Sequence, residues 1–260
     1  MLGHRIISAL VMLPLVVGAV WLGGPVFDSM TAFCAVVMAW EWNAMVKGRF
    51  GGAGFITALA GAGAVMVAAT YPLIALLVAG GGAVIAGLVG RGSVWLAAGT
   101  LYIALPCTAL VWLRAVHGLE TLLWLFLVVW VTDIGAYSVG RWIGGPRLAP
   151  AISPGKTWSG AVGGLFAAMG AGGTLAVLPD FAVPWTVMVV VSAGLSVVAQ
   201  GGDLVESKIK RHFGVKDSSR LIPGHGGVLD RVDGVLAAAP VVAGSALISG
   251  GGIQSWGAWF

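Results

Sequence analysis

The chain has 260 residues, of which 58% are hydrophobic and only 9% are charged. Soluble globular domains carry about 25% charged residues, so the composition excludes an ordinary soluble protein. The formal net charge of +4 is modest, and we expect no nucleic-acid partner. Repeated apolar runs of near-spanning length predict an all-α, polytopic membrane helical bundle, organised as a single domain over residues 1–260.

The apolar runs predict about nine membrane-spanning helices. Their expected ranges are 6–22, 28–46, 53–70, 72–89, 95–114, 120–140, 160–178, 185–204 and 234–252. We expect the first to be a retained span, because no clear cleavage site of a secretory signal follows it. The division at Tyr71-Pro72 leaves a second interpretation open, in which one long kinked helix replaces two.

The basic residues predict the orientation in the membrane. With a cytoplasmic N-terminus, every lysine and arginine except Arg114 falls in a cytoplasmic segment, as the positive-inside rule requires. The C-terminus then lies outside. Arg114, His117 and Glu120 are expected on the outer side as a surface group.

Two residue types have structural interpretations. Glycines spread through the spans, as in 61–63 and 160–164, predict close approach of helices, since small residues drive association in lipid. Cys34 and Cys107 lie in apolar runs without metal-ligand spacing, so we interpret them as buried thiols.

The longest polar run is 200–233, QGGDLVESKIKRHFGVKDSSRLIPGHGGVLDRVD. Its start predicts a helix end that places four polar side chains on one face, by their i, i+3, i+4, i+7 spacing. These are Asp203, Glu206, Ser207 and Lys210. Asp230 and Asp233, again three apart, lead into the next apolar run, so two helix ends could aim carboxylates at a common point.

Between these helix ends, residues 223–227 must turn, because glycine permits positive φ and exposes backbone N–H groups. Exposed N–H groups and basic side chains suit phosphate, whereas clustered carboxylates suit Mg²⁺. A cytoplasmic loop with internal salt bridges is the alternative interpretation of the run.

Three more polar residues lie near apolar runs. Asp133 is a candidate functional residue, since a carboxylate in hydrocarbon costs at least about 2.5–3.5 kcal/mol; a structural ion pair is the alternative. Lys156, in ISPGKTWSG, could hold phosphate or could snorkel toward the interface. Glu41, between two tryptophans, could support the site or be a simple interfacial residue.

The polar run resembles the signature of phosphatidate cytidylyltransferases, also called CDP-diacylglycerol synthases. That pattern is Ser-x-x-Lys-Arg, four residues, Lys-Asp, then Pro-x-His-Gly-Gly, two residues and Asp-Arg-x-Asp. Every fixed position is matched, by Ser207, Lys210, Arg211, Lys216, Asp217, Pro223, His225, Gly226, Gly227, Asp230, Arg231 and Asp233. The segments around Asp133 and Lys156 resemble two further family segments, but Ser159 stands where the family usually has Glu.

The resemblance implies an enzyme of phospholipid biosynthesis in the cytoplasmic (inner) membrane, with its active site facing the cytoplasm. It implies transfer of the cytidylyl group of CTP to phosphatidate, giving CDP-diacylglycerol and pyrophosphate. We expect Asp203 and Asp230 to be the principal Mg²⁺ ligands. The expected catalytic residues are Asp133, Lys210, Arg211, Lys216, Asp217, Arg231 and Asp233, and the expected substrate-binding residues are Lys156, Ser207, His225, Gly226 and Gly227.

Two other functions stay open at this point. A CTP-dependent lipid-alcohol kinase would use the same nucleotide but release CDP. An ion-coupled transporter would use Asp133 as an ion site. A second ion, a homodimer and the acyl-chain preference are not decided by the residues.

Overall fold

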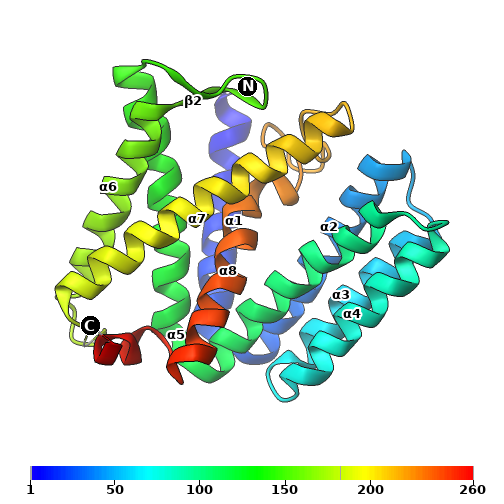
Figure 1. The fold of residues 1–260 in the computed structure, drawn as a ribbon, viewed down its shortest axis with the longest axis horizontal. Helices are drawn as coiled ribbons and strands as arrows, with labels where there is room; N and C mark the ends of the chain where they lie inside the picture. Colours follow the sequence, from blue (N-terminus) through cyan, green and yellow to red (C-terminus); the bar gives the residue numbers. More distant parts are fainter. Residues whose placement is uncertain (1, 182, 260) are drawn as a thin grey trace. The chain divides into compact units, whose positions relative to one another are not determined.

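The computed structural model describes residues 2–181 and 183–259, and side chains within residues 11–256. These residues form eight α-helices, a two-stranded β-hairpin and a short 3-10 helix (Figure 1). The elements are α1 Leu2–Leu22, α2 Gly24–Lys47, α3 Gly52–Ala68, α4 Pro72–Val89, α5 Val94–Ile143, β1 Arg147–Ala149, β2 Ser153–Thr157, α6 Trp158–Leu175, α7 Trp185–His212, α8 Leu229–Ser249 and η1 Ile253–Trp259.

The all-α, membrane-type architecture predicted from the sequence is confirmed. Within the described residues, four helices are long and apolar enough to cross a membrane, namely α4, α5, α7 and α8. The predicted ranges 95–114 and 120–140 both fall in α5, which kinks at Gly118 (φ 84°). The count of about nine spans and the cytoplasmic N-terminus stay predictions, and the side chain of Arg5, on which the first span's orientation depends, lies outside the described ones.

Glycine and proline set several helix ends. Gly48 (φ 70°) ends α2 in the left-handed conformation, and its N–H donates to the Ala44 carbonyl. Tyr71 precedes α4, which starts at Pro72, where a proline costs no intrahelical hydrogen bond. The chain therefore divides there into two helices, and a single kinked helix is excluded.

The chain forms two compact units. Unit 1 contains Met1–Val116 and His212–Val232, and unit 2 contains His117–Arg211 and Asp233–Phe260. The single-domain organisation therefore stays a prediction.

Unit 1 is held by close helix contacts. Helices α2, α3 and α4 lie side by side (Figure 1). A Cβ on Gly61 of α3 would lie 3.3 Å from the Ala35 methyl of α2, so this glycine permits close approach, as predicted. The buried hydroxyls of Thr57 and Thr100 are 2.8 Å apart, which joins α3 to α5.

Arg114 has a structural role within unit 1. Its Nε donates to the Val20 carbonyl at 2.8 Å and its Nη2 to the Trp21 carbonyl at 3.1 Å. These carbonyls belong to the last turn of α1, where they have no intrahelical partner. The residue that breaks the positive-inside pattern is thus a helix cap, not a simple surface cation.

In unit 2, glycines bring α5 and α6 together (Figure 1). A Cβ on Gly160 would lie 2.6 Å from the Ala136 carbonyl oxygen, and one on Gly164 would lie 2.8 Å from that of Thr132. The predicted packing role of the 160–164 glycines is confirmed. The antiparallel β1–β2 hairpin connects the two helices and was not expected from the sequence.

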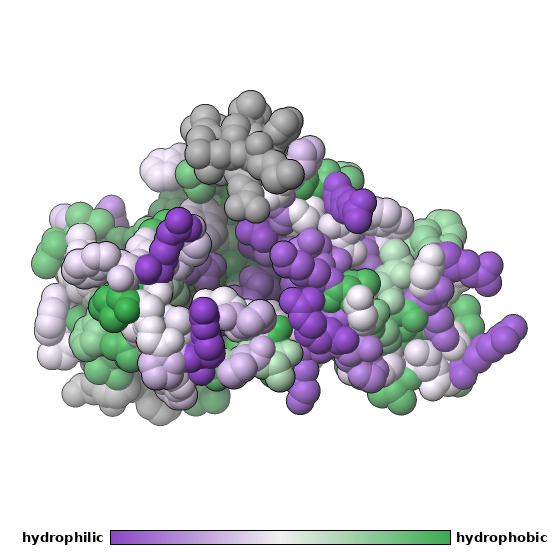
Figure 2. Space-filling view, turned by 90° about the horizontal axis from the view of Figure 1, so that it is seen from above, coloured by the Kyte–Doolittle hydropathy of each residue, from purple (hydrophilic) through white to green (hydrophobic). Residues whose placement is uncertain are grey.

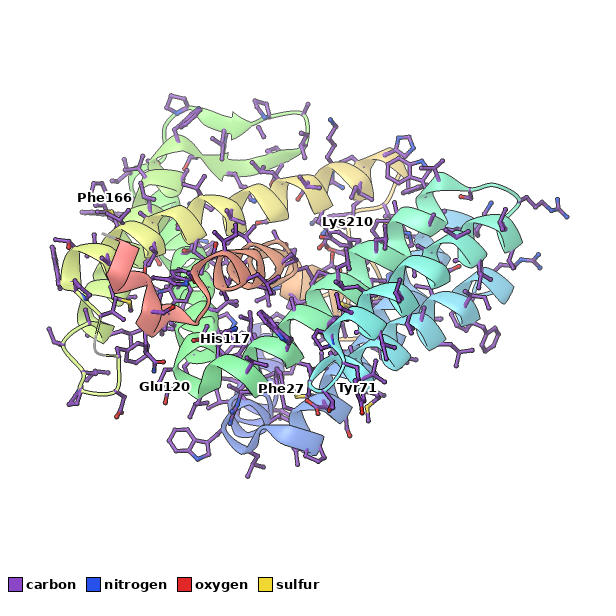
Figure 3. All side chains as sticks on the ribbon, turned by 60° about the horizontal axis from the view of Figure 1, so that its bottom comes forward. Phe27, Tyr71, His117, Glu120, Phe166 and Lys210 are labelled. Carbon is purple, nitrogen blue, oxygen red and sulfur yellow. The ribbon has the colours of Figure 1, made fainter. Side chains whose placement is uncertain are left out.

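The surface has the mixed character of a membrane protein. Many large apolar side chains are exposed, including Phe166 at 64% and Tyr71 at 57% (Figure 3). Figure 2 shows hydrophilic residues gathered beside hydrophobic ones on the face that it displays. Exposed apolar side chains of this number suit contact with lipid, and hydrophilic groups suit the aqueous boundary.

Candidate active site

The signature segment connects the end of α7 to the start of α8, as predicted. Helix α7 ends at His212 and α8 begins at Leu229, so Asp230 lies in the first turn of α8 and Asp233 one turn further along. The predicted turn is present as well. The Ile222 N–H donates to the Gly226 carbonyl at 2.8 Å, and the His225 N–H donates back to the Ile222 carbonyl at 2.9 Å.

In unit 2, the polar face of α7 carries two side-chain pairs. Ser207 Oγ donates to Asp203 Oδ1 at 3.3 Å, and Lys210 Nζ forms an ion pair with Glu206 Oε1 at 3.0 Å. Both pairs have the i, i+4 spacing of one helix face, which confirms the predicted arrangement. Lys210, shown in Figure 3, and Glu206 are both buried, so each charge is compensated by the other.

The β-hairpin adds basic contacts to this face. Lys156 Nζ, on β2, forms an ion pair with Asp203 Oδ2. Arg211 donates from Nε to the Ile152 carbonyl at 3.3 Å. The hairpin therefore places one predicted substrate-binding residue directly against a predicted metal ligand.

Close backbone contact between α7 and α8 brings further acids to the same region of unit 2. A Cβ on Gly202 would lie 3.0 Å from the Asp233 carbonyl oxygen, so the two helices nearly touch there. The Asp233 carboxylate lies near enough to those of Asp203, Glu206 and Asp133 to interact electrostatically with each. Acidic side chains of α5, α7 and α8 thus lie in one region of unit 2.

The acidic side chains of this region have the donor chemistry that a magnesium ion prefers. Carboxylate oxygens are the ligands that hard divalent cations prefer. Among the residues that the structure describes, however, no group of three or more Asp, Glu, His or Cys side chains is placed so that it could hold a metal ion. The oxygen donors fit Mg²⁺ by type, and the predicted ligand set stays a prediction.

In unit 1, Asp230 holds the signature turn together. Its Oδ2 accepts three hydrogen bonds of 2.8 Å, from the N–H and hydroxyl of Ser218 and from the N–H of Gly227. This oxygen is committed to the loop. Asp230 therefore has a structural task that the predicted role of metal ligand did not include.

Glu41 of α2 is fully buried and contacts the same turn. Its Oε1 accepts from Ser219 Oγ at 2.7 Å and from the Val228 N–H at 2.8 Å. Its Oε2 accepts from the Leu229 N–H at 2.8 Å and lies 3.3 Å from Ser218 Oγ. Of the two interpretations of Glu41, the structure favours support of the signature segment.

Gly226 and Gly227 each occupy a position that favours glycine, for different physical reasons. Gly226 adopts φ +86°, a conformation that glycine accepts without strain. Gly227 lies against Ser218 Oγ and Glu41 Oε1, where a Cβ would overlap both. Their N–H groups donate to the Ile222 carbonyl and to Asp230 Oδ2, so binding a phosphate would require these hydrogen bonds to be exchanged.

The remaining predicted residues divide between the units. Lys216, Asp217 and Arg231 are exposed in unit 1, and His225 is half-buried in the turn. Asp133 is exposed on α5 in unit 2. The assignment of catalytic and substrate-binding roles to all of these residues stays a prediction.

Comparison with known proteins identifies the family to which the chain belongs. Residues 3–248 match the model of the cytidylyltransferase family. This chain belongs to that family. The chain is 42% identical over 247 residues to the phosphatidate cytidylyltransferase of Brucella suis biovar 1 (strain 1330), a match that covers 92% of this chain and 90% of the relative. It is 47% identical over 126 residues to that of Staphylococcus saprophyticus, covering 48% of each chain. The resemblance inferred from the signature is confirmed.

In this cytidylyltransferase, Ser159 closes the hairpin. Its hydroxyl bonds to the Gly144 carbonyl and lies 3.0 Å from Thr157 Oγ1. Thr157 caps α6 by accepting from the Gly160 N–H. The serine at this position is therefore part of a local hydrogen-bond network between the hairpin and the helix start.

Two residues of the cytidylyltransferase that contact the site were missed from the sequence, Ser218 and Ser219. Both contact Glu41, and Ser218 also contacts Asp230. One observation could have pointed to them. A glutamate in an apolar helix needs donors, and the nearest unassigned hydroxyls of the polar run are these two serines.

Proposed function

We propose that this protein transfers the cytidylyl group of CTP to phosphatidate, giving CDP-diacylglycerol and pyrophosphate. The observation that carries the proposal is the complete signature of residues 207–233 in a chain that is 42% identical, over 92% of its length, to a relative of that name. The proposal extends to a location in the inner membrane with the site facing the cytoplasm, since the basic residues gather on the predicted inner side. A homodimer is an open part of the proposal.

The chemistry needs no nucleophilic side chain. A phosphate oxygen of phosphatidate, already ionised near neutral pH, attacks the α-phosphorus of CTP. A new P–O bond forms, the bond from the α-phosphorus to the bridging oxygen breaks, and its electron pair leaves with pyrophosphate. The main barrier is the meeting of two polyanions, which calls for positioning and fixed positive charge.

Several basic side chains could supply the positive charge that this reaction needs. Lys156 of β2 contacts the polar face of α7, and Lys210 and Arg211 lie on α7 itself; the cations of all three suit the binding of phosphate oxygens. Lys216 and Arg231 are exposed cations of unit 1 with the same chemistry.

Asp203 would supply oxygen donors for Mg²⁺, with Asp133 and Asp233 of the same unit close by. Bound Mg²⁺ would neutralise negative charge on the phosphates. The number of ions stays open.

The test incubates the purified, full-length protein with CTP labelled at the α-phosphorus, phosphatidate and Mg²⁺. We expect label in a CDP-lipid and an equal amount of pyrophosphate, and we expect EDTA to remove both. In a parallel incubation with a lipid alcohol in place of phosphatidate, release of CDP with phosphorylation of that alcohol would instead indicate a kinase. Absence of any nucleotide conversion, with phosphatidate and Mg²⁺ present, would refute the proposal.

A further inference from the structure

We propose that Glu41 is a positioning residue for the transfer reaction, which sets the geometry of the signature turn from a different helix. The inference rests on the proposed function for its kinetic consequence. The contacts on which the inference is based lie entirely within unit 1, and they do not depend on the proposed function.

The first observation is that both Glu41 oxygens are engaged by one short segment. Oε1 accepts from Ser219 Oγ and the Val228 N–H, and Oε2 accepts from the Leu229 N–H. The carboxylate thus joins two consecutive backbone amides at the start of α8 to the Ser219 side chain, which lies earlier in the same loop. Such charge-assisted, two-oxygen binding restrains orientation as well as distance.

The second observation is where these amides lie. Val228 immediately precedes α8 and Leu229 is its first residue. The first N–H groups of a helix lack intrahelical acceptors and carry the positive end of the helix dipole. Glu41 therefore supplies, from α2, the cap that the sequence of α8 does not supply itself, and so fixes where α8 begins.

The third observation connects Glu41 to the signature carboxylate. Ser218 Oγ lies 3.3 Å from Glu41 Oε2 and 2.8 Å from Asp230 Oδ2. A hydroxyl has one proton, so the shorter distance indicates donation to Asp230. The position of Asp230, which accepts hydrogen bonds from Ser218 and Gly227 in the turn, is thereby coupled to Glu41 through one serine.

These contacts require a carboxylate. Glutamine has one carbonyl oxygen and one NH₂ group. Whichever way its amide faces, the NH₂ would oppose a backbone N–H, either that of Val228 or that of Leu229. Glu41→Gln thus keeps the size of the side chain and removes one acceptor, which makes it the decisive variant.

The experiment compares the full-length wild type, Glu41→Gln and Thr31→Val, with kcat and KM expressed per folded molecule. Thr31 is buried on the same helix but donates only to the Phe27 carbonyl within that helix, so Thr31→Val is the matched control. We expect kcat/KM of Glu41→Gln to fall roughly 10- to 100-fold, as for loss of a hydrogen bond to a charged group. We expect Thr31→Val to match the wild type.

A second readout does not depend on activity. Amide hydrogen exchange of the 218–229 segment is expected to be faster in Glu41→Gln, by about tenfold or more, and unchanged in Thr31→Val. Unchanged exchange in Glu41→Gln overturns the inference. So do wild-type kcat and KM in the folded variant, since a purely stabilising residue would change yield or unfolding temperature alone.

Two outcomes are kept separate. If wild type and Thr31→Val make no CDP-lipid, the proposed function fails, while the exchange data still decide whether Glu41 holds the turn. If Glu41→Gln does not fold, Ser219→Ala replaces it, because it removes one donor to Glu41. A severalfold loss of kcat/KM with faster exchange supports the inference, and wild-type values for both overturn it.

Discussion

Lys156 and Asp203, which lie on the β-hairpin and on α7, form a direct ion pair. The pair joins a predicted phosphate-binding cation to a predicted metal-binding carboxylate. Both side chains are partly exposed, so the pair itself contributes only about 0–1 kcal/mol to stability. Its importance is therefore expected in the reaction rather than in folding.

Replacement of Asp203 tests this expectation. Asp203→Asn should lower turnover about hundredfold or more, because it removes a carboxylate from the converging acids. The unfolding temperature should change little. Turnover measured on purified protein, beside a thermal unfolding curve, checks both parts. Asp180→Asn, the same change in the α6–α7 connection, is the control and should keep activity; full activity in Asp203→Asn would remove this residue from the site.

Asp230 should behave differently, because its Oδ2 accepts three hydrogen bonds within the turn. Asp230→Asn should lose activity and also about 1–3 kcal/mol of stability, since it leaves buried donors unpaired or opposes them with NH₂. Denaturant or thermal unfolding in detergent measures the second effect. An inactive Asp230→Asn of unchanged stability would contradict the structural task assigned to this oxygen.

Gly227 is expected to tolerate no side chain. In Gly227→Ala the new methyl would overlap Ser218 Oγ and Glu41 Oε1, so we expect about 1–3 kcal/mol of destabilisation and a loss of activity. Gly194→Ala, on α7, is the matched control, because no atom lies within 4 Å of the added Cβ. Equal stability of the two variants would show that the turn can relax around a methyl.

Arg114 should affect stability without affecting chemistry. Arg114→Met would leave the Val20 and Trp21 carbonyls without their donor, at a cost of about 1–3 kcal/mol. Unfolding temperature and kcat, measured on the same preparation, separate the two effects. The control is Arg49→Met, because Arg49 is exposed and has no hydrogen bond or ion pair in the described part of the chain; it should change neither quantity. A loss of kcat alone in Arg114→Met would argue against a capping role.

Local features were predictable from the order of residues. The start of α4 at Pro72 follows from proline chemistry, and the Ser207–Asp203 and Lys210–Glu206 pairs follow from the 3.6-residue period of α7. The signature also identified the family, because its polar residues are spaced within one short run. Each of these features depends on residues that are close together in the sequence, so it can be predicted without knowledge of the tertiary structure.

Contacts between distant segments were decided only by the tertiary structure. Glu41 could have been interfacial, and nothing in its spacing points to Val228 or Leu229. The Lys156–Asp203 pair likewise requires a hairpin to be placed beside α7. The physical reason is that periodicity determines which face a residue occupies, whereas helix packing, set by close approaches such as Gly202 against α8, determines what that face meets.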